Sequence, residues 1–163
     1  MSATASIPSG LLEMMARGVS VIVGSRDASL RPSLMRAVGS QLSADQRTIT
    51  VYLVRAQSRQ LLQDIAATGQ VAAVFSEPAT HRTVQVKAGT ASIRNAAPQD
   101  APVLARYLAS MENEIQRVGY PPPMTRAMLA HRTEELVAVS FVPQQAFDQT
   151  PGPRAGARLG DTS

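Results

Sequence analysis

Two arginines, Arg31 and Arg36, occupy a predicted strand in the segment LRPSLMRAVG. Residues five positions apart on a regular strand point to opposite faces, so one of the two arginines is predicted to point inward. A guanidinium in the interior is costly unless it meets an anion, which makes this pair a candidate anion site. The alternative is that Arg31 lies at a strand end and Arg36 on the solvent face of an edge strand.

A second polar group, Gln57–Gln60 with the sequence QSRQ, opens a predicted helix. Free backbone N–H groups and the helix dipole favour an anion at such a start. Ser58 adds a hydroxyl, Arg59 a guanidinium and Gln60 an amide. The alternative is an N-cap serine followed by a solvated arginine.

A third polar group alternates with valines in the segment HRTVQVKAGTA. Thr83, Gln85 and Lys87 are separated by Val84 and Val86, which predicts a strand with a hydroxyl, an amide and an ammonium on one face. That face meets either water or a ligand. His81 is predicted to lie in the turn before this strand.

Several kinds of chemistry find no support in the sequence. There are no cysteines, which excludes thiolate metal sites and a cysteine nucleophile, and the two histidines, His81 and His131, are far apart. No glycine-rich nucleotide loop is present, and no serine has a nucleophile-elbow context. We therefore predict no metal site, and the catalytic residues stay unknown.

Composition describes an ordinary globular chain of 163 residues with 44% apolar and 17% charged residues. The net charge of +4 allows an anionic partner. Only three Phe and three Tyr are available to stack on bases, so nucleic acid is not the predicted partner. Because the N-terminus lacks a secretion signal and no apolar run approaches ~20 residues, we expect a cytoplasmic protein without a membrane span.

Hydrophobic periodicity predicts an α+β, mainly β, protein with one domain at 1–148. The segment 149–163 is rich in Pro and Gly and reads as a C-terminal arm or a disordered tail. Helices are expected at 9–18, 58–69, 97–119 and 124–132. Strands are expected at 19–23, 30–39, 48–56, 70–77, 83 to about 94, and 135–149. Hairpin-linked strands favour a small, six-stranded antiparallel barrel with peripheral helices.

From about Leu11 to Asp148, the sequence resembles the pyridoxamine 5′-phosphate oxidase-like, FMN-binding split β-barrel family. The motifs that carry the resemblance are RPSLMRAVG, SRQLLQDI and HRTVQVKAGTA. The resemblance implies that Arg31 and Arg36, together with Ser58, Arg59 and Gln60, hold the phosphate of FMN. Gln60 stands where the family usually has a basic residue.

The same resemblance implies that Gln85, in one row with Thr83 and Lys87, meets the flavin ring, and that the protein is a homodimer with each flavin between subunits. The hypothesis is an FMN-dependent oxidoreductase of unknown substrate. Its flavin is reduced by a nicotinamide donor and reoxidised by a small organic acceptor or by oxygen. The alternative is a non-catalytic split-barrel protein that binds flavin, haem or another cofactor. The substrate-binding Arg and His pattern of the oxidase is not recognisable near the C-terminus, so the vitamin-forming activity is not predicted.

Overall fold

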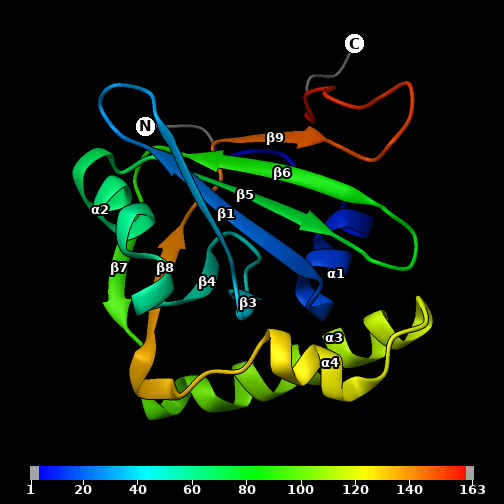
Figure 1. The fold of residues 1–163 in the computed structure, drawn as a ribbon. Coiled ribbons are helices and arrows are strands. Elements are labelled where there is room, and N and C mark those ends of the chain that lie inside the picture. Colours follow the sequence, from blue (N-terminus) through cyan, green and yellow to red (C-terminus); the bar gives the residue numbers. More distant parts are fainter. Residues whose placement is uncertain (1–3, 161–163) are drawn as a thin grey trace.

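The computed structural model describes residues 4–160, which form four α-helices, nine strands and three short 3₁₀ turns (Figure 1). The helices are α1 Ser9–Arg17, α2 Arg59–Thr68, α3 Ala101–Arg117 and α4 Pro122–Met128. The strands are β1 Ser20–Arg26, β2 Pro32–Arg36, β3 Gly39–Leu42, β4 Ile49–Val54, β5 Val71–Ser76, β6 Thr83–Ala88, β7 Ser92–Asn95, β8 Leu136–Phe141 and β9 Gln145–Asp148.

The strands make two antiparallel sheets. One has five strands in the order β2-β1-β5-β6-β9, and the other has four in the order β3-β4-β8-β7. Valines that face the space between the sheets, among them Val21, Val86 and Val139, are fully buried. The chain is therefore α+β, as predicted.

The prediction of six strands in one barrel needs correction, because three of the expected strands each divide between the two sheets and the described sheets do not close into a barrel. The expected strand 30–39 becomes β2 and β3. Ala37 donates its N–H to Val21 of the five-stranded sheet, and Val38 donates to Tyr52 of the four-stranded sheet. The expected strands 83–94 and 135–149 divide in the same way, at Gly89 and at Pro143. At these corners a strand leaves one sheet and joins the other. Hydrophobic alternation continues across a corner, so the sequence pattern does not reveal it.

Helices α3 and α4 lie along one end of the molecule, and α2 lies beside β2 and β1 (Figure 1). Gly39 shows how closely α3 packs, since a Cβ there would stand 2.7 Å from a methyl group of Leu104. At the end of α2, Gly69 has a φ of +69° and ends the helix, as predicted. None of the described helices has the length and apolar character needed to cross a bilayer.

The segment after β9 folds back on that strand. Leu159 donates its N–H to Ala146 and Asp148 donates to Ala157, both at 2.8 Å, and Phe147 forms an isolated bridge with Arg158. Residues 149–160 thus form an arm along the edge of the five-stranded sheet, while residues 161–163 of the predicted tail lie outside the described residues.

Candidate functional site

The row Thr83, Gln85 and Lys87 lies on the side of the five-stranded sheet that faces away from the core. In β6 the intervening Val84 and Val86 are fully buried. The row is paired with Ser76, Val74 and Ala72 of β5. We call this side, which carries Ile22, Val74, Gln85 and Lys87, the outer face.

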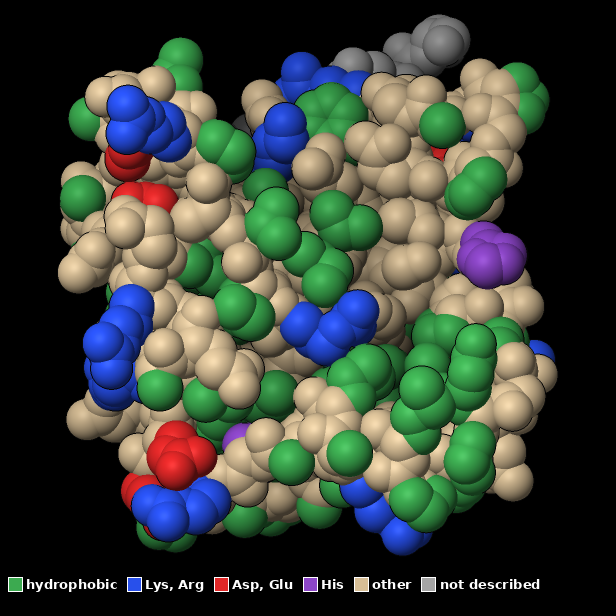
Figure 2. Space-filling model, in the orientation of Figure 1, with side chains coloured by type: hydrophobic (Ala, Val, Ile, Leu, Met, Phe, Trp, Pro, Cys, Tyr) green, Lys and Arg blue, Asp and Glu red, His purple; other side chains and the backbone are tan. Residues whose placement is uncertain are grey.

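The pairing register extends the outer face across the whole sheet. Arg36 pairs with Ile22, Ile22 with Val74, Val74 with Gln85, and Gln85 with Phe147. Because neighbouring strands lie about 4.8 Å apart, Arg36 and Gln85 stand roughly 14 Å apart across an apolar middle. Figure 2 shows hydrophobic side chains gathered over β1 and β5 in this view, with Lys and Arg side chains to either side.

Each member of the predicted row has a neighbour on this face. The Thr83 hydroxyl lies 2.8 Å from that of Ser76. Gln85 Oε1 accepts a long, 3.4 Å hydrogen bond from Gln149. Lys87 Nζ stands 5.1 Å from the centre of the Phe147 ring, which is cation–π range.

The two predicted arginines separate, and neither enters the core. Arg36 is half-buried on the outer face, where its Nη1 donates to Ser20 Oγ at 2.7 Å. Arg31 is exposed and precedes β2, with its backbone N–H donating to the Asp27 carboxylate at 2.9 Å. The expectation that one of them points inward was wrong, because Arg31 lies outside the regular strand on which that expectation depends.

The start of α2 holds an unusual hydroxyl. Ser58 is the N-cap and only 2% exposed, yet its side chain makes no capping bond, and its Oγ has no hydrogen-bond partner within residues 4–160. A buried hydroxyl without a partner is costly, so a ligand oxygen at this helix start would satisfy it. Arg59 is exposed beside it.

Gln60 is turned along the helix rather than toward its start. Its Nε2 donates to Asp64 at 2.9 Å, and Asp64 also accepts a 2.5 Å hydrogen bond from Ser33 of β2. The amide of Gln60 is therefore bound within α2, and it is Asp64 that links the helix to β2.

The direction of α2 places its start near one end of β2. Asp64, in the middle of the helix, contacts Ser33, and Ser25, the β1 partner of Ser33, donates to the carbonyl of Gln70 just beyond the helix. The chain enters α2 from β4, whose Tyr52 pairs with Gly39 just beyond β2, so the N-terminus of the helix lies toward the Arg36 end of β2. Arg36 and the start of α2 share a level, but Arg36 points to the outer face and α2 lies on the other side of β2.

Arg59 lines a hollow of about 280 Å³ together with Arg55, Glu134 and Glu135. Both glutamates lie 3.1 Å from Arg132. Two carboxylates in this hollow oppose an anion there, so the anion-binding character of the region rests on the Ser58 side of the helix start.

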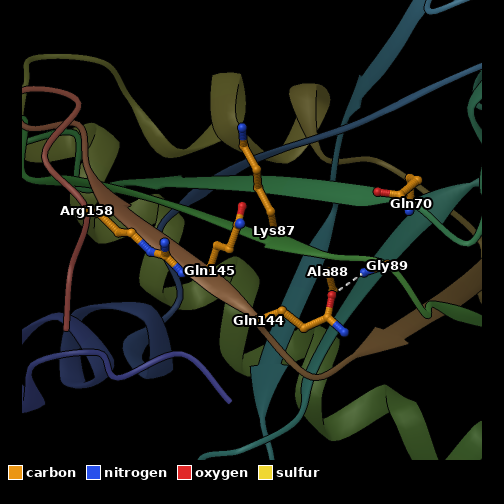
Figure 3. Close-up of a pocket in the computed structure, with 7 residues that line it drawn as sticks. All are labelled: Gln70, Lys87, Ala88, Gly89, Gln144, Gln145 and Arg158. Carbon is orange, nitrogen blue, oxygen red and sulfur yellow. Dashed lines mark hydrogen bonds between the residues drawn. The ribbon is translucent and has the colours of Figure 1, made fainter. Parts of the chain in front are cut away.

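The structure also shows a groove that the sequence did not indicate. We call it the polar groove; it measures about 410 Å³ and is lined by Gln70, Lys87, Ala88, Gly89, Gln144, Gln145 and Arg158 (Figure 3). Of these, only Lys87 was predicted as a site residue. The rest come together through the pairing of β6 with β9 and through the arm, which are non-local contacts without a signal in the sequence.

A second hollow, of about 320 Å³, adjoins the polar groove and shares Gln70 and Lys87 with it. It lies against the β1–β2 hairpin and is lined by Gly24, Ser25, Arg26, Pro32, Ser33, Leu34, Val71 and Ala72 as well. Both volumes lie in the range of small-molecule sites. Lys87 therefore stands at the junction of two cavities and the outer face.

Neither histidine lines the polar groove or the hollow beside it. Residues 4–160 contain no group of three or more His, Cys, Asp or Glu side chains that could hold a metal ion. His81 is exposed in the turn between β5 and β6, and His131 Nδ1 lies 2.8 Å from the carbonyl of Leu129.

Strong pKa shifts occur away from these cavities. Burial, together with the Asp100 carboxylate, raises the pKa of Tyr52 to about 12. The Arg94 guanidinium holds the pKa of Asp100 well below its usual range, helped by hydrogen bonds from Ala97 and Tyr52. This hydrogen-bond network lies at the four-stranded sheet, and we interpret it as stabilising the fold.

Comparison by sequence finds no matching family model and no matching curated protein. Comparison of structures finds HupZ of Group A Streptococcus, with a TM-score of 0.55 and 14% identity over 93% of this chain and 100% of that one. An F420 reductase has a TM-score of 0.55 and 15% identity over 86% and 98% of the two chains. A pyridoxamine 5′-phosphate oxidase-related, FMN-binding protein of Nostoc punctiforme has a TM-score of 0.54 and 10% identity over 94% and 89%.

At these identities the likeness concerns the fold, and it extends over nearly the whole of each chain. The chain has the fold of the pyridoxamine 5′-phosphate oxidase-like proteins.

Proposed function

We propose that this protein is an FMN-dependent oxidoreductase that binds its flavin against the outer face. The observation that carries the proposal is the placement of Arg36, Gln85 and Lys87 around an apolar middle on one open sheet face. A flavin ring needs a flat apolar surface with hydrogen-bonding groups at its edge, and its phosphate needs cations or free N–H groups. Structural neighbours named for FMN and F420 support this choice of cofactor class.

The residues fit the two ends of FMN in different ways. Ile22 and Val74 would contact the ring, and Gln85 would offer its amide to the ring edge beside Thr83 and Lys87. The phosphate would meet the start of α2, where the Ser58 hydroxyl has no hydrogen-bond partner among the described residues. Arg59 and Arg36 would add positive charge around it, while Arg31 lies at the opposite end of β2 and Gln60 would contribute little because Asp64 holds its amide.

FMN bound in this way would supply electron transfer from a nicotinamide donor to a small organic acceptor or to oxygen. The protein's own part is to position the ring on the sheet and to neutralise the phosphate. A second copy of the chain would cover the outer face, where Leu34 is 66% exposed and Ile22, Val74 and Phe147 are only partly buried. We propose a homodimer on this ground.

The first test is the absorbance spectrum of the purified protein and the identity of any chromophore released by denaturation. We expect a flavin spectrum, or saturable quenching of FMN fluorescence when FMN is added. A colourless protein that leaves FMN fluorescence unchanged would contradict the proposal. A Soret band would indicate haem instead.

The second test is the Arg59→Ala variant, with Arg106→Ala on the exposed surface of α3 as the matched control. Loss of a charge-assisted phosphate contact should weaken FMN binding by about 1.5–3 kcal/mol, or roughly ten- to hundredfold. Arg106→Ala should bind like wild type. Equal affinity in the two variants would mean that the start of α2 does not hold the phosphate.

Turnover is tested by following oxidation of reduced nicotinamide with and without an added quinone or oxygen. Consumption of the donor that depends on bound FMN is expected. FMN bound without such turnover would favour the alternative of a non-catalytic cofactor-binding protein.

A further inference from the structure

We propose that the polar groove binds a second ligand, a small organic anion carrying phosphate or carboxylate groups, next to the flavin. Insofar as this anion is the substrate, the inference rests on the proposed function. The existence of an anion site in the groove does not depend on it.

Charge is the first argument. The polar groove contains Lys87 and Arg158, and the adjoining hollow adds Arg26, but neither lining includes an Asp or a Glu. A third hollow, of about 160 Å³, continues past Arg158 to the segment 4–6 and also lacks acidic residues. Concave surfaces lined by charge of one sign concentrate counter-ions, so these connected cavities favour an anion.

The two cations of the groove are positioned by the fold. Arg158 lies on the arm between two backbone hydrogen bonds, one from Asp148 to Ala157 and one from Leu159 to Ala146. Figure 3 shows its side chain reaching from the arm toward Gln145. Lys87 rises from the neighbouring strand over the Phe147 ring. The arm therefore brings a guanidinium into the same groove that Lys87 lines.

The amide side chains of the groove indicate which polar groups the bound anion carries besides its charge. Gln144 accepts a 2.9 Å hydrogen bond from the N–H of Gly89 through its Oε1, which leaves its NH₂ group as a donor (Figure 3). Gln70 and Gln145 add amides that both donate and accept. Such a lining suits an anion with a polar body, such as a phosphorylated or multiply carboxylated metabolite.

The groove adjoins the proposed flavin position. Gln85 and Lys87 are two residues apart on β6, point to the same side and stand about 7 Å apart. A ligand held by Lys87 would therefore lie beside a flavin ring held at Gln85, as a substrate must.

The test is calorimetric titration of flavin-free protein with inorganic pyrophosphate and, separately, with citrate. We expect saturable binding of at least one of them at millimolar concentrations or below. Preference for pyrophosphate assigns the site to phosphorylated ligands, and preference for citrate assigns it to polycarboxylates. Arg158→Ala should weaken this binding about tenfold or more. Arg154→Ala, an exposed arginine on the same arm that lines none of the three cavities, should leave it unchanged.

Absence of binding by both anions, or equal affinity in Arg158→Ala and wild type, would overturn the proposal. A third titration adds FMN to protein saturated with the anion. Independent binding of the two supports a separate site. Competition would overturn the proposal, since the groove would then hold the flavin's own phosphate. Binding of FMN without binding of either anion would contradict the anion site alone. Binding of an anion without binding of FMN would contradict the proposed function alone.

Discussion

The two sheets differ in how far their faces are buried. In the four-stranded sheet, all six residues of β4 are buried, and α3 packs closely on β3 at Gly39. In the five-stranded sheet, β5 and β6 alternate between buried and partly exposed residues, and the outer face stays open. The central strands of the four-stranded sheet, β4 and β8, are enclosed in the domain, although its edge strand β7 is exposed, while the five-stranded sheet offers an open face.

The difference indicates where each sheet tolerates change. Polar groups at the enclosed sheet, such as Tyr52 and Asp100, are satisfied by each other and stabilise the fold. Polar groups on the open face, such as Gln85 and Lys87, make few contacts within the chain. Mutations of the polar groups at the enclosed sheet should change the free energy of unfolding. Mutations of the polar groups on the open face should change the affinity for a ligand.

The largest effect is expected within β6 itself. Val86→Asp places an unpaired carboxylate in a fully buried position and should cost more than about 4 kcal/mol, enough to prevent folding of a marginally stable domain. Gln85→Asp, one residue away on the outer face, should remain folded. Circular dichroism and denaturant unfolding of the two variants provide the measurement. Similar losses of the free energy of unfolding in the two variants would show that the outer face is covered.

Asp100→Ala should produce the next largest loss. Its carboxylate accepts hydrogen bonds from Arg94, Ala97 and Tyr52, each at 2.8 Å, and it is 3% exposed. Removing it leaves a buried phenol and a backbone N–H without their acceptor and should lower the free energy of unfolding by about 3 kcal/mol. Glu13→Ala on the exposed side of α1 is the control. A denaturant midpoint close to that of Glu13→Ala would show that this network contributes nothing.

Gly69→Ala tests the corner that carries the polar groove. A Cβ at this position would meet the Gly89 carbonyl at 2.5 Å, and its φ of +69° disfavours alanine. We expect a loss of about 2 kcal/mol, measured by urea unfolding. Gly119→Ala has the same kind of φ, +98°, but meets nothing within 4 Å, so it separates backbone strain from the clash. Equal losses in the two variants would exclude a contribution from the close approach of Gly89.

Local patterns predicted the elements well and the sheets poorly. Periodicity and the glycine at position 69 indicated α2 within one residue at each end, because those signals are local. The corners at Ala37–Val38, Gly89 and Pro143 escaped prediction, because a strand that passes between sheets keeps its alternation. The sequence indicated the row of Gln85 and Lys87, but Arg158 lines the same groove as Lys87 only because the arm folds back on β9, which joins distant parts of the chain.

The smallest effect concerns pH and the enclosed sheet. The pKa of Tyr52 is raised to about 12, so between pH 10 and 12 the unfolded chain loses a proton that the folded protein keeps. Stability must therefore fall as the pH rises through this window. Tyr52→Phe should cost about 1 kcal/mol at neutral pH, through the lost hydrogen bond to Asp100, and should make the alkaline fall shallower. Part of the alkaline loss of stability should persist in Tyr52→Phe, because burial also raises the pKa of Tyr107. Thermal unfolding from pH 8 to 12 measures the slope, with Tyr120→Phe at a 51% exposed phenol as the control. If Tyr52→Phe and Tyr120→Phe give the same alkaline slope, the open and enclosed regions do not differ in the way that their burial implies.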